Sequence, residues 1–253
     1  QQAAAAHADE TSWRQAGQRC WLWVVVTTLA TVFTLAPSRG RVVIQGLLGG
    51  AFAGYLVTDR WSAYTWLPPE RRQVCWAHLK RDFQALVDLG GGARPIGETG
   101  LTLIARLFDA WYAGRDEPAP RPRLAAATAL LRDEFHALLG QGQRSGHYKA
   151  IGLCESVLKL EPALWTFLTV AGVEPTNNAA EQALRPAVLW RKGSFGTQSP
   201  GGNAFVTRML SVAATCKQQQ RSLLEYLTAV CTAAQQRQPI PSLLPATPLA
   251  DVA

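Results

Sequence analysis

The run Trp21-Leu-Trp-Val-Val-Val-Thr-Thr is the feature that most restricts how this chain can fold. It combines tryptophan with β-branched residues, a composition that is typical of strands. Residues 31–35 follow closely enough to pair with it as a hairpin. The whole apolar stretch falls short of the roughly 20 residues needed to span a bilayer, and threonines interrupt it. We therefore predict sheet here and no membrane segment.

Further strands and helices are predicted around this hairpin. Residues 3–14 are a short apolar run ending in acids, and we expect a first strand with Asp9 at or near its end. The next predicted elements are a short helix at 41–48, a buried strand ending in an acid at 54–59, a strand at 72–77 and a helix at 78–86. This order mixes an antiparallel meander with crossover connections. It predicts an α/β fold, namely a ribonuclease-H-like mixed five-stranded sheet flanked by helices.

The pattern changes to helices after a glycine-rich break near residue 90. From residue 98 to about 170, apolar residues recur at helical spacing, interrupted by a proline-rich loop. Two closing helices are expected at 205–216 and 222–233. We predict a core in two parts, 1–92 and 173–235, an all-helical insertion at 93–172 between them, and a flexible tail at 236–253.

Composition limits the partners and the compartment. The net charge of +7 favours a polyanionic partner. The five cysteines are odd in number and scattered without a C-x-x-C pair, which argues against a disulfide framework and for a reducing compartment. The single methionine is Met209, so we expect the sequence to be a fragment of a longer protein.

Residues 176–196 combine an acid with several bases. The stretch starts like a helix and places Glu181 about one turn in. Arg185 follows on the same helix face, and Arg191 and Lys192 come next. An acid near a helix start, followed by bases suited to phosphate, suggests a site for metal and phosphate.

Helix capping is the alternative interpretation of this acid. With Asn178 as the N-cap residue, Glu181 would stand at the capping-box position, where it bonds the cap's backbone N–H. Partner carboxylates elsewhere in the chain are needed to favour a metal site over a cap.

Asp9 and Asp59 are the partner carboxylates that the strand pattern offers. If their strands are parallel neighbours, the two acids meet at one edge of the sheet, and Glu181 on a nearby helix completes a cluster of three. Such acids repel unless cations neutralise them, and two Mg²⁺ ions roughly 3.5–4 Å apart are the common solution in phosphodiester chemistry. Mn²⁺ is a possible substitute. Glu10 should point to the opposite strand face. The other rival acids are Asp82, an ion-pair candidate, Glu155 and Glu174.

Four motifs in order resemble the catalytic region of insertion sequence 66 family transposases, over roughly residues 5–235. They are His7-Ala-Asp-Glu-Thr, Val57-Thr-Asp-Arg-Trp-Ser-Ala-Tyr64, Cys75-Trp-Ala-His-Leu-Lys-Arg-Asp-Phe83, and Asn177-Asn-Ala-Ala-Glu-Gln-Ala-Leu-Arg-Pro186 with Arg191-Lys. The resemblance implies a DDE-type transposase with a helical insertion before its last acid. Asp9, Asp59 and Glu181 match the family's three acids. Arg60 departs from the glycine that members often have, and the family's upstream helical and zinc-binding segments are absent.

The resemblance also implies partners and a location. They are DNA at transposon ends and targets, further copies of the chain on DNA, accessory proteins of the same element, no membrane, and a bacterial cytoplasm or nucleoid. The candidate DNA-binding residues are His78, Lys80, Arg81, Asn178, Arg185, Arg191 and Lys192. For the bases, a solvated surface is the alternative. For Cys75 and His78, the alternatives are half of a zinc site and a buried cysteine beside a hydrogen-bonded histidine.

The predicted activity is Mg²⁺-dependent DNA cleavage and strand transfer. One alternative is an inactive, truncated or domesticated remnant that only binds DNA. Another is a ribonuclease-H-like nuclease or resolvase, although such enzymes have no evident need for so large a helical insertion.

Overall fold

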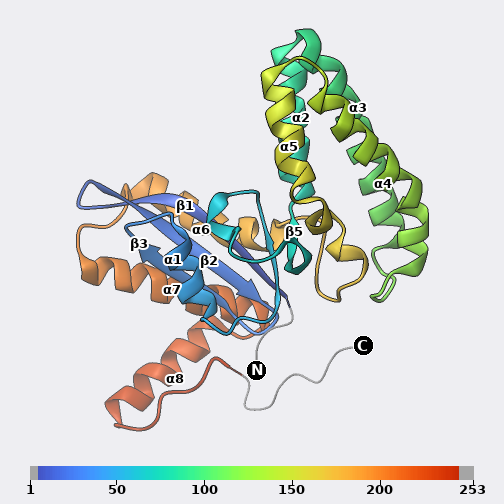
Figure 1. Ribbon diagram of the computed structural model, residues 1–253. Helices are drawn as coiled ribbons and strands as arrows, with labels where there is room; N and C mark the ends of the chain where they lie inside the picture. Colours follow the sequence, from blue (N-terminus) through green and yellow to red (C-terminus); the bar gives the residue numbers. More distant parts are fainter. Residues whose placement is uncertain (1–4, 245–253) are drawn as a thin grey trace. The chain divides into compact units, whose positions relative to one another are not determined.

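The computed structural model describes residues 5–244, which form two compact units (Figure 1). Within these residues, the sheet unit comprises 5–56, 61–66 and 177–244. The helical unit comprises 57–60 and 67–176. The two units are described separately below.

Three antiparallel strands form the meander of the sheet unit: β1 (Ala5–Gln15), β2 (Gln18–Thr27) and β3 (Thr31–Ala36). Ala16 and Gly17 close the first hairpin, and both have positive φ angles, which suits a two-residue turn. With β4 (Tyr55–Thr58) and β5 (Arg72–Val74), the strand order is β3-β2-β1-β4-β5. The predicted α/β fold with a five-stranded sheet and flanking helices is confirmed. The ribonuclease-H-like assignment stays a prediction.

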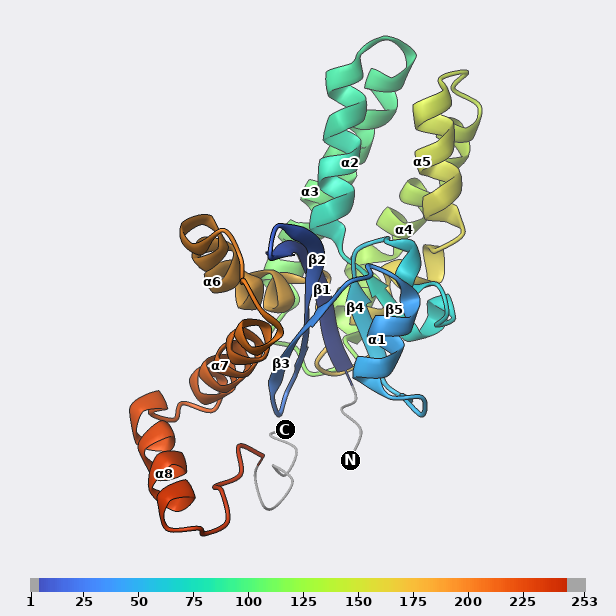
Figure 2. The same cartoon turned by 90° about the vertical axis from the view of Figure 1, so that its left-hand side faces the viewer.

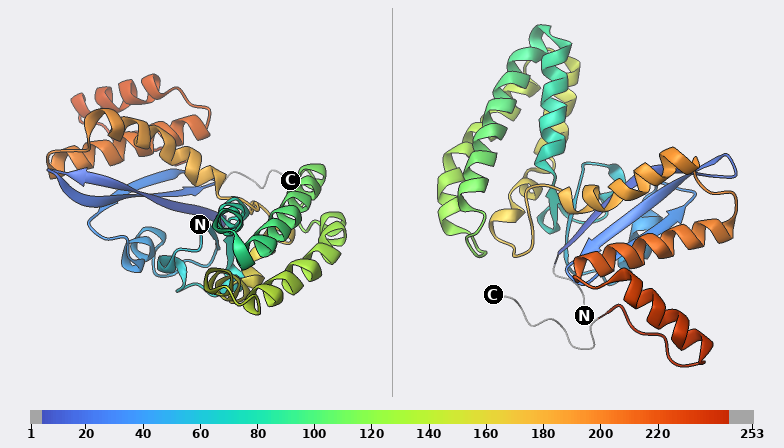
Figure 3. Two further views of the ribbon diagram at one scale, coloured as in Figure 1. Left: turned by 90° about the horizontal axis from the view of Figure 1, so that it is seen from above. Right: turned by 180° about the vertical axis from the view of Figure 1, so that it is seen from behind.

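Helices cover both faces of the meander (Figure 3). On one face lie α6 (Asn178–Ser194) and α7 (Pro200–Gln218), and on the other lies α1 (Arg41–Leu48). β2 buries four consecutive side chains, Leu22 to Val25, as expected for a strand covered on both sides. The core against α6 and α7 contains Trp13, Leu22, Val24, Phe33, Leu184 and Leu210. α8 (Leu223–Gln235) packs against α7 (Figure 2).

The edge strand β3 is closed by side chains of α7. The Phe33 backbone N–H donates to Ser211 Oγ at 2.8 Å, and the Thr31 N–H donates to Thr215 Oγ1 at 3.1 Å. Thr215 Oγ1 in turn donates to the Thr31 carbonyl at 3.1 Å. Backbone groups that an edge strand usually leaves to solvent therefore have partners inside the unit.

The helical unit contains four long helices: α2 (Trp76–Leu89), α3 (Arg94–Gly114), α4 (Pro122–Gln143) and α5 (Tyr148–Leu158) (Figure 1). Within residues 5–244, the 3-10 turns are Ser62–Tyr64, Pro69–Arg71, Gly91–Ala93, Glu161–Leu164 and Thr166–Leu168. The last two bind β5: the Gln73 amide donates to the Leu164 carbonyl at 3.1 Å and accepts from the Phe167 N–H at 2.9 Å.

Two of the differences between predicted and observed segment ends have a packing reason. The strand predicted at 72–77 ends at Val74, and α2 begins at Trp76, because Trp76 continues the buried stripe of Leu79, Phe83 and Leu86. The predicted boundary at residue 92 also differs from the division into units, because α2 packs against α3 and groups with the helices.

The predicted tail is described only in part. Residues 245–253 lie outside the described residues. Before them, the Tyr226 hydroxyl donates to the Pro241 carbonyl at 3.0 Å, and the Gln219 amide donates to the Leu243 carbonyl at 2.8 Å. The chain is therefore tied to α7 and α8 as far as Leu243.

Glycines allow the close approach of α2 and α3. A Cβ added at Gly100 would lie 2.3 Å from the Phe83 ring, and one at Gly97 would lie 2.7 Å from the Phe83 carbonyl. We expect G100A to lower the free energy of unfolding by about 1–3 kcal/mol because the core cannot accept the added methyl group. Chemical denaturation measures this loss.

Gly152 on α5 gives the matched control for this substitution. It is exposed, and a Cβ there would meet no atom within 4 Å. G152A should leave stability unchanged or raise it by about 0.5–1 kcal/mol, since alanine is the better helix former. Equal effects of the two substitutions would contradict the packing described here.

The five cysteines form no disulfide with one another. Among the helices within residues 5–244, none is long and apolar enough to cross a membrane.

Thiol reactivity should follow burial. Cys231 is exposed and the other four cysteines are buried. Burial raises the pKa of the Cys154 thiol to about 11, so its reactive thiolate is scarce at pH 8. We expect a maleimide to label Cys231 alone in the folded protein, with C231S unlabelled until denaturant is added. Fast labelling of native C231S would contradict this result.

Candidate active site

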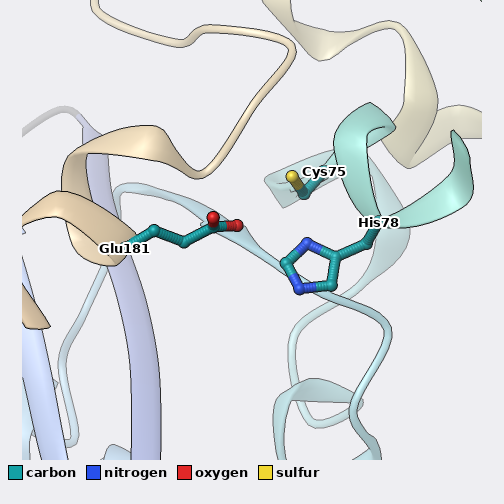
Figure 4. A group of neighbouring side chains, drawn as sticks. All are labelled: Cys75, His78 and Glu181. Carbon is teal, nitrogen blue, oxygen red and sulfur yellow. The ribbon is translucent and has the colours of Figure 1, made fainter. Parts of the chain in front are cut away.

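Glu181 lies in the first turn of α6, but it does not form the predicted capping box (Figure 4). The helix begins at Asn178, so Asn177 holds the cap position and Glu181 stands one residue beyond the capping-box position. The Glu181 N–H donates to the Asn177 carbonyl at 3.1 Å, which is the usual helical bond. The assignment of Asn178 as the cap was therefore wrong.

Asn177 connects the start of α6 to β1. Its side chain is fully buried, and Nδ2 donates to the Ala8 carbonyl at 2.8 Å. Ala8 directly precedes Asp9 on the strand. This bond fixes the helix start that carries Glu181 to the stretch of β1 that carries Asp9. The sequence reasoning missed this function of Asn177.

The other end of α6 is also fastened to β1. The Thr197 N–H donates to the Arg14 carbonyl at 2.9 Å, and the Ala16 N–H donates to the Thr197 carbonyl at 2.7 Å. Gly196 makes this approach possible, because a Cβ there would lie 2.2 Å from the Arg14 carbonyl oxygen. From the last turn of α6, Arg191 Nη1 donates to Thr11 Oγ1 of β1 at 3.0 Å.

Asp9 lies in the middle of β1, not at or near its end as predicted. It pairs with Val24 of β2, and the strand continues for six further residues to Gln15. The reason is that pairing with β2 extends to the two-residue turn at Ala16 and Gly17. The Asp9 side chain remains partly exposed.

Glu10 is excluded as a rival by its own contacts. Its side chain is buried, and its carboxylate accepts from Arg39 Nε at 2.6 Å and from the Tyr64 hydroxyl at 2.5 Å. The alternation of side chains along a strand assigned Glu10 to the opposite face from Asp9. Its ion pair gives Glu10 a structural function in the core of the sheet unit.

Asp59 directly follows β4, as the sequence predicted, and it belongs to the helical unit. Its side chain is partly exposed, while its carbonyl accepts from Thr58 Oγ1 at 2.8 Å and from Arg72 Nη2 at 3.4 Å. The Arg72 side chain is almost fully buried. The backbone that carries Asp59 is therefore held from within the unit.

Arg60, which departs from the glycine expected from the resemblance, makes structural contacts of its own. Its guanidinium pairs with Asp82 of α2 at 2.7 Å and donates to Ser156 of α5 at 2.8 Å. The Arg60 side chain thus connects the segment that carries Asp59 to α2 and α5. Asp82 forms an ion pair, as predicted, and its partner is Arg60.

The motif that contains Cys75 and His78 lies at the start of α2 (Figure 4). Cys75 is buried at the cap position, and His78 lies partly exposed in the first turn. The Cys75 sulfur and a His78 ring nitrogen lie within 4.8 Å of one another. They supply two of the four ligands that a structural zinc site needs. Lys80 and Arg81 are exposed.

The remaining DNA-binding candidates lie on α6. Asn178, Arg185 and Lys192 are exposed, whereas Arg191 is partly buried against β1. Exposed bases along one helix suit contact with phosphates. Their contact with DNA stays a prediction.

Comparison with known proteins identifies the family. The model of the Transposase IS66 family matches residues 1–204. The chain belongs to this family. A relative named as uncharacterized protein y4qI, from Sinorhizobium fredii strain NGR234, is 27% identical over 259 residues. The match covers 90% of the present chain and 46% of the relative, so this IS66-family chain spans less than half the length of that protein. No solved structure matches it.

The contribution of the hydrogen bond from Asn177 to Ala8 can be tested by comparing substitutions of Asn177 and Asn178. We expect N177A to lower the free energy of unfolding by about 1–3 kcal/mol, because it leaves a buried carbonyl without this donor. N178A should change it by less than about 0.5 kcal/mol, since Asn178 is exposed. Urea denaturation measures both values. A loss of about 1 kcal/mol in N178A would instead restore Asn178 as the cap.

Proposed function

We propose that this chain catalyses divalent-metal-dependent cleavage and strand transfer of DNA, as a DDE-type transposase. The match of the IS66 transposase family over residues 1–204 carries this proposal. The net charge of +7 supports a polyanionic substrate. We also propose that the chain acts as a homo-oligomer on DNA, with accessory proteins of the same element as further partners.

Asp9, Asp59 and Glu181 are the proposed metal ligands. All three side chains are partly exposed, and carboxylate oxygens are the ligands that Mg²⁺ prefers. Glu10, the neighbouring acid, is occupied by Arg39 and Tyr64. When bound, two Mg²⁺ or Mn²⁺ ions would activate the attacking water or DNA 3′-hydroxyl and stabilise the leaving oxygen.

The chain's own residues hold and orient the reactants in this proposal. Asp9 would serve both metal positions, while Asp59 and Glu181 would each serve mainly one. Asn177 keeps the start of α6 on β1, and Arg60 keeps the segment after Asp59 on its helices. The exposed bases Arg185 and Lys192 bind phosphates. No serine or tyrosine nucleophile is assigned, because water or a DNA hydroxyl attacks the phosphodiester directly.

His78, Lys80 and Arg81 are proposed as a second group of DNA contacts. Lys80 and Arg81 are exposed on α2, and His78 is partly exposed in its first turn. In this proposal His78 binds DNA, and Cys75 remains a buried thiol beside it.

The proposed third ligand can be tested with two isosteric variants. We expect E181Q to reduce Mg²⁺-dependent nicking of duplex DNA by at least about a hundredfold, because it removes a metal-binding charge. DNA affinity should stay within about twofold. The control is E174Q, an equal change at an exposed acid seven residues earlier, which should cut at the wild-type rate.

Three results of this experiment are informative. Full nicking activity in E181Q would contradict the assignment of Glu181. Loss of activity in both variants would point to a general effect of charge. Salt-sensitive DNA binding by the wild-type chain, without nicking in Mg²⁺ or Mn²⁺, would favour the inactive DNA-binding remnant over the enzyme.

A further inference from the structure

Two arginines face each other at the end of the β1–β2 hairpin. Arg14 and Arg19 are direct partners in the antiparallel register, and both are exposed. Like charges placed opposite each other destabilise a strand pair. Within residues 5–244, no carboxylate forms an ion pair with either arginine or with Arg191. Among the described residues, no acid therefore compensates the repulsion between Arg14 and Arg19.

A pocket of about 430 Å³ opens at this position in the sheet unit. Its lining contains three guanidinium groups and no acid. The lining residues are Ser12, Trp13, Arg14, Arg19, Arg191 and Phe195. A concave site with three positive charges concentrates an anion.

Each arginine of the pocket is held by its neighbours. Arg14 Nη1 donates to the Gly17 carbonyl at 2.9 Å, and the Arg19 guanidinium lies 4.7 Å from the centre of the Trp21 ring. Arg191 Nη1 donates to Ser12 Oγ at 2.9 Å and also to the Ser12 carbonyl. Holding the guanidinium groups in advance lowers the entropy that a ligand must overcome on binding.

Donors remain for a ligand. Among the described residues, every hydrogen bond of Arg191 uses Nη1, so Nε–H and Nη2 are not engaged in the protein. The planar fork of arginine matches the oxygens of a phosphate and binds them in pairs.

The rim of the pocket favours nucleic acid over a free anion. Phe195 leaves 78% of its surface exposed, at the left-handed residue that ends α6. In proteins that bind nucleic acids, exposed aromatic rings beside basic side chains stack with nucleobases. An apolar ring gives no advantage to a small inorganic ion.

We propose that Arg14, Arg19 and Arg191 form a binding pocket for a backbone phosphate of DNA, with Phe195 against the adjoining nucleotide. This inference rests on the proposed function, since it assumes that DNA is the substrate. It adds Arg14 and Arg19 of the hairpin to the DNA-binding surface, and it gives Arg191 a defined partner.

Salt-dependent DNA binding tests the pocket. We expect R19Q to weaken binding of a 20-base-pair duplex about tenfold and to lower the slope of log K against log salt by about one, because one phosphate contact is lost. The matched control is R208Q, an exposed arginine on α7 in the same unit, which should retain the wild-type slope. Identical slopes for R19Q and the wild type would overturn the proposal.

Inorganic phosphate gives a second readout that needs no DNA. Bound phosphate should offset the repulsion between Arg14 and Arg19, so it should raise the melting temperature of the wild type more than that of R19Q. R208Q should respond like the wild type, which accounts for general effects of salt. Equal shifts in all three proteins would contradict an anion site at this position.

The two proposals can fail separately. If the wild type cuts no DNA with Mg²⁺, but R19Q binds DNA and phosphate more weakly than the wild type, the pocket is supported and the proposed activity is not. If the wild type cuts DNA while R19Q binds phosphate and DNA like R208Q, the activity stands and the pocket does not.

Discussion

The attachment of α6 to β1 is the interaction on which the sheet unit depends. One buried amide, Asn177 Nδ2, holds the helix start to the Ala8 carbonyl, and the Thr197 backbone holds the far end to Arg14 and Ala16. A helix that packs only through apolar contacts can slide along a sheet by small amounts. Directional bonds at both ends prevent such movement. They fix which residue of α6 is adjacent to the acid-bearing part of β1.

The same contacts explain how the acids differ. Asp9 and Glu10 are neighbours in sequence, yet Glu10 accepts bonds from Arg39 and Tyr64 while Asp9 stays partly exposed on the other strand face. Asp9 Oδ1 itself accepts the Glu10 backbone N–H at 2.8 Å, so the two acids differ in exposure and in the kind of partner. The alternation of side chains along one strand thus gives the two neighbouring acids different surroundings.

Several of these features could be predicted from sequence because they follow local patterns. The β-branched run of β2, the acid after β4 and the opposite faces of Asp9 and Glu10 are of this kind. The position of Asp9 within its strand was missed, because the length of β1 is set by pairing with β2. The function of Asn177 was missed because its partner lies 169 residues away in the chain. Arg60 binds Ser156 across 96 residues, and no periodicity indicates such a pair.

The closed edge of β3 restricts how copies of this chain can associate. Exposed edge strands commonly join two molecules into one continuous sheet. Here Ser211 and Thr215 already occupy the backbone groups of Phe33 and Thr31. Along β3, these bonds reduce the number of backbone groups that a neighbouring strand could pair with. Contact between copies through helix surfaces would leave these bonds of β3 intact when the copies come apart.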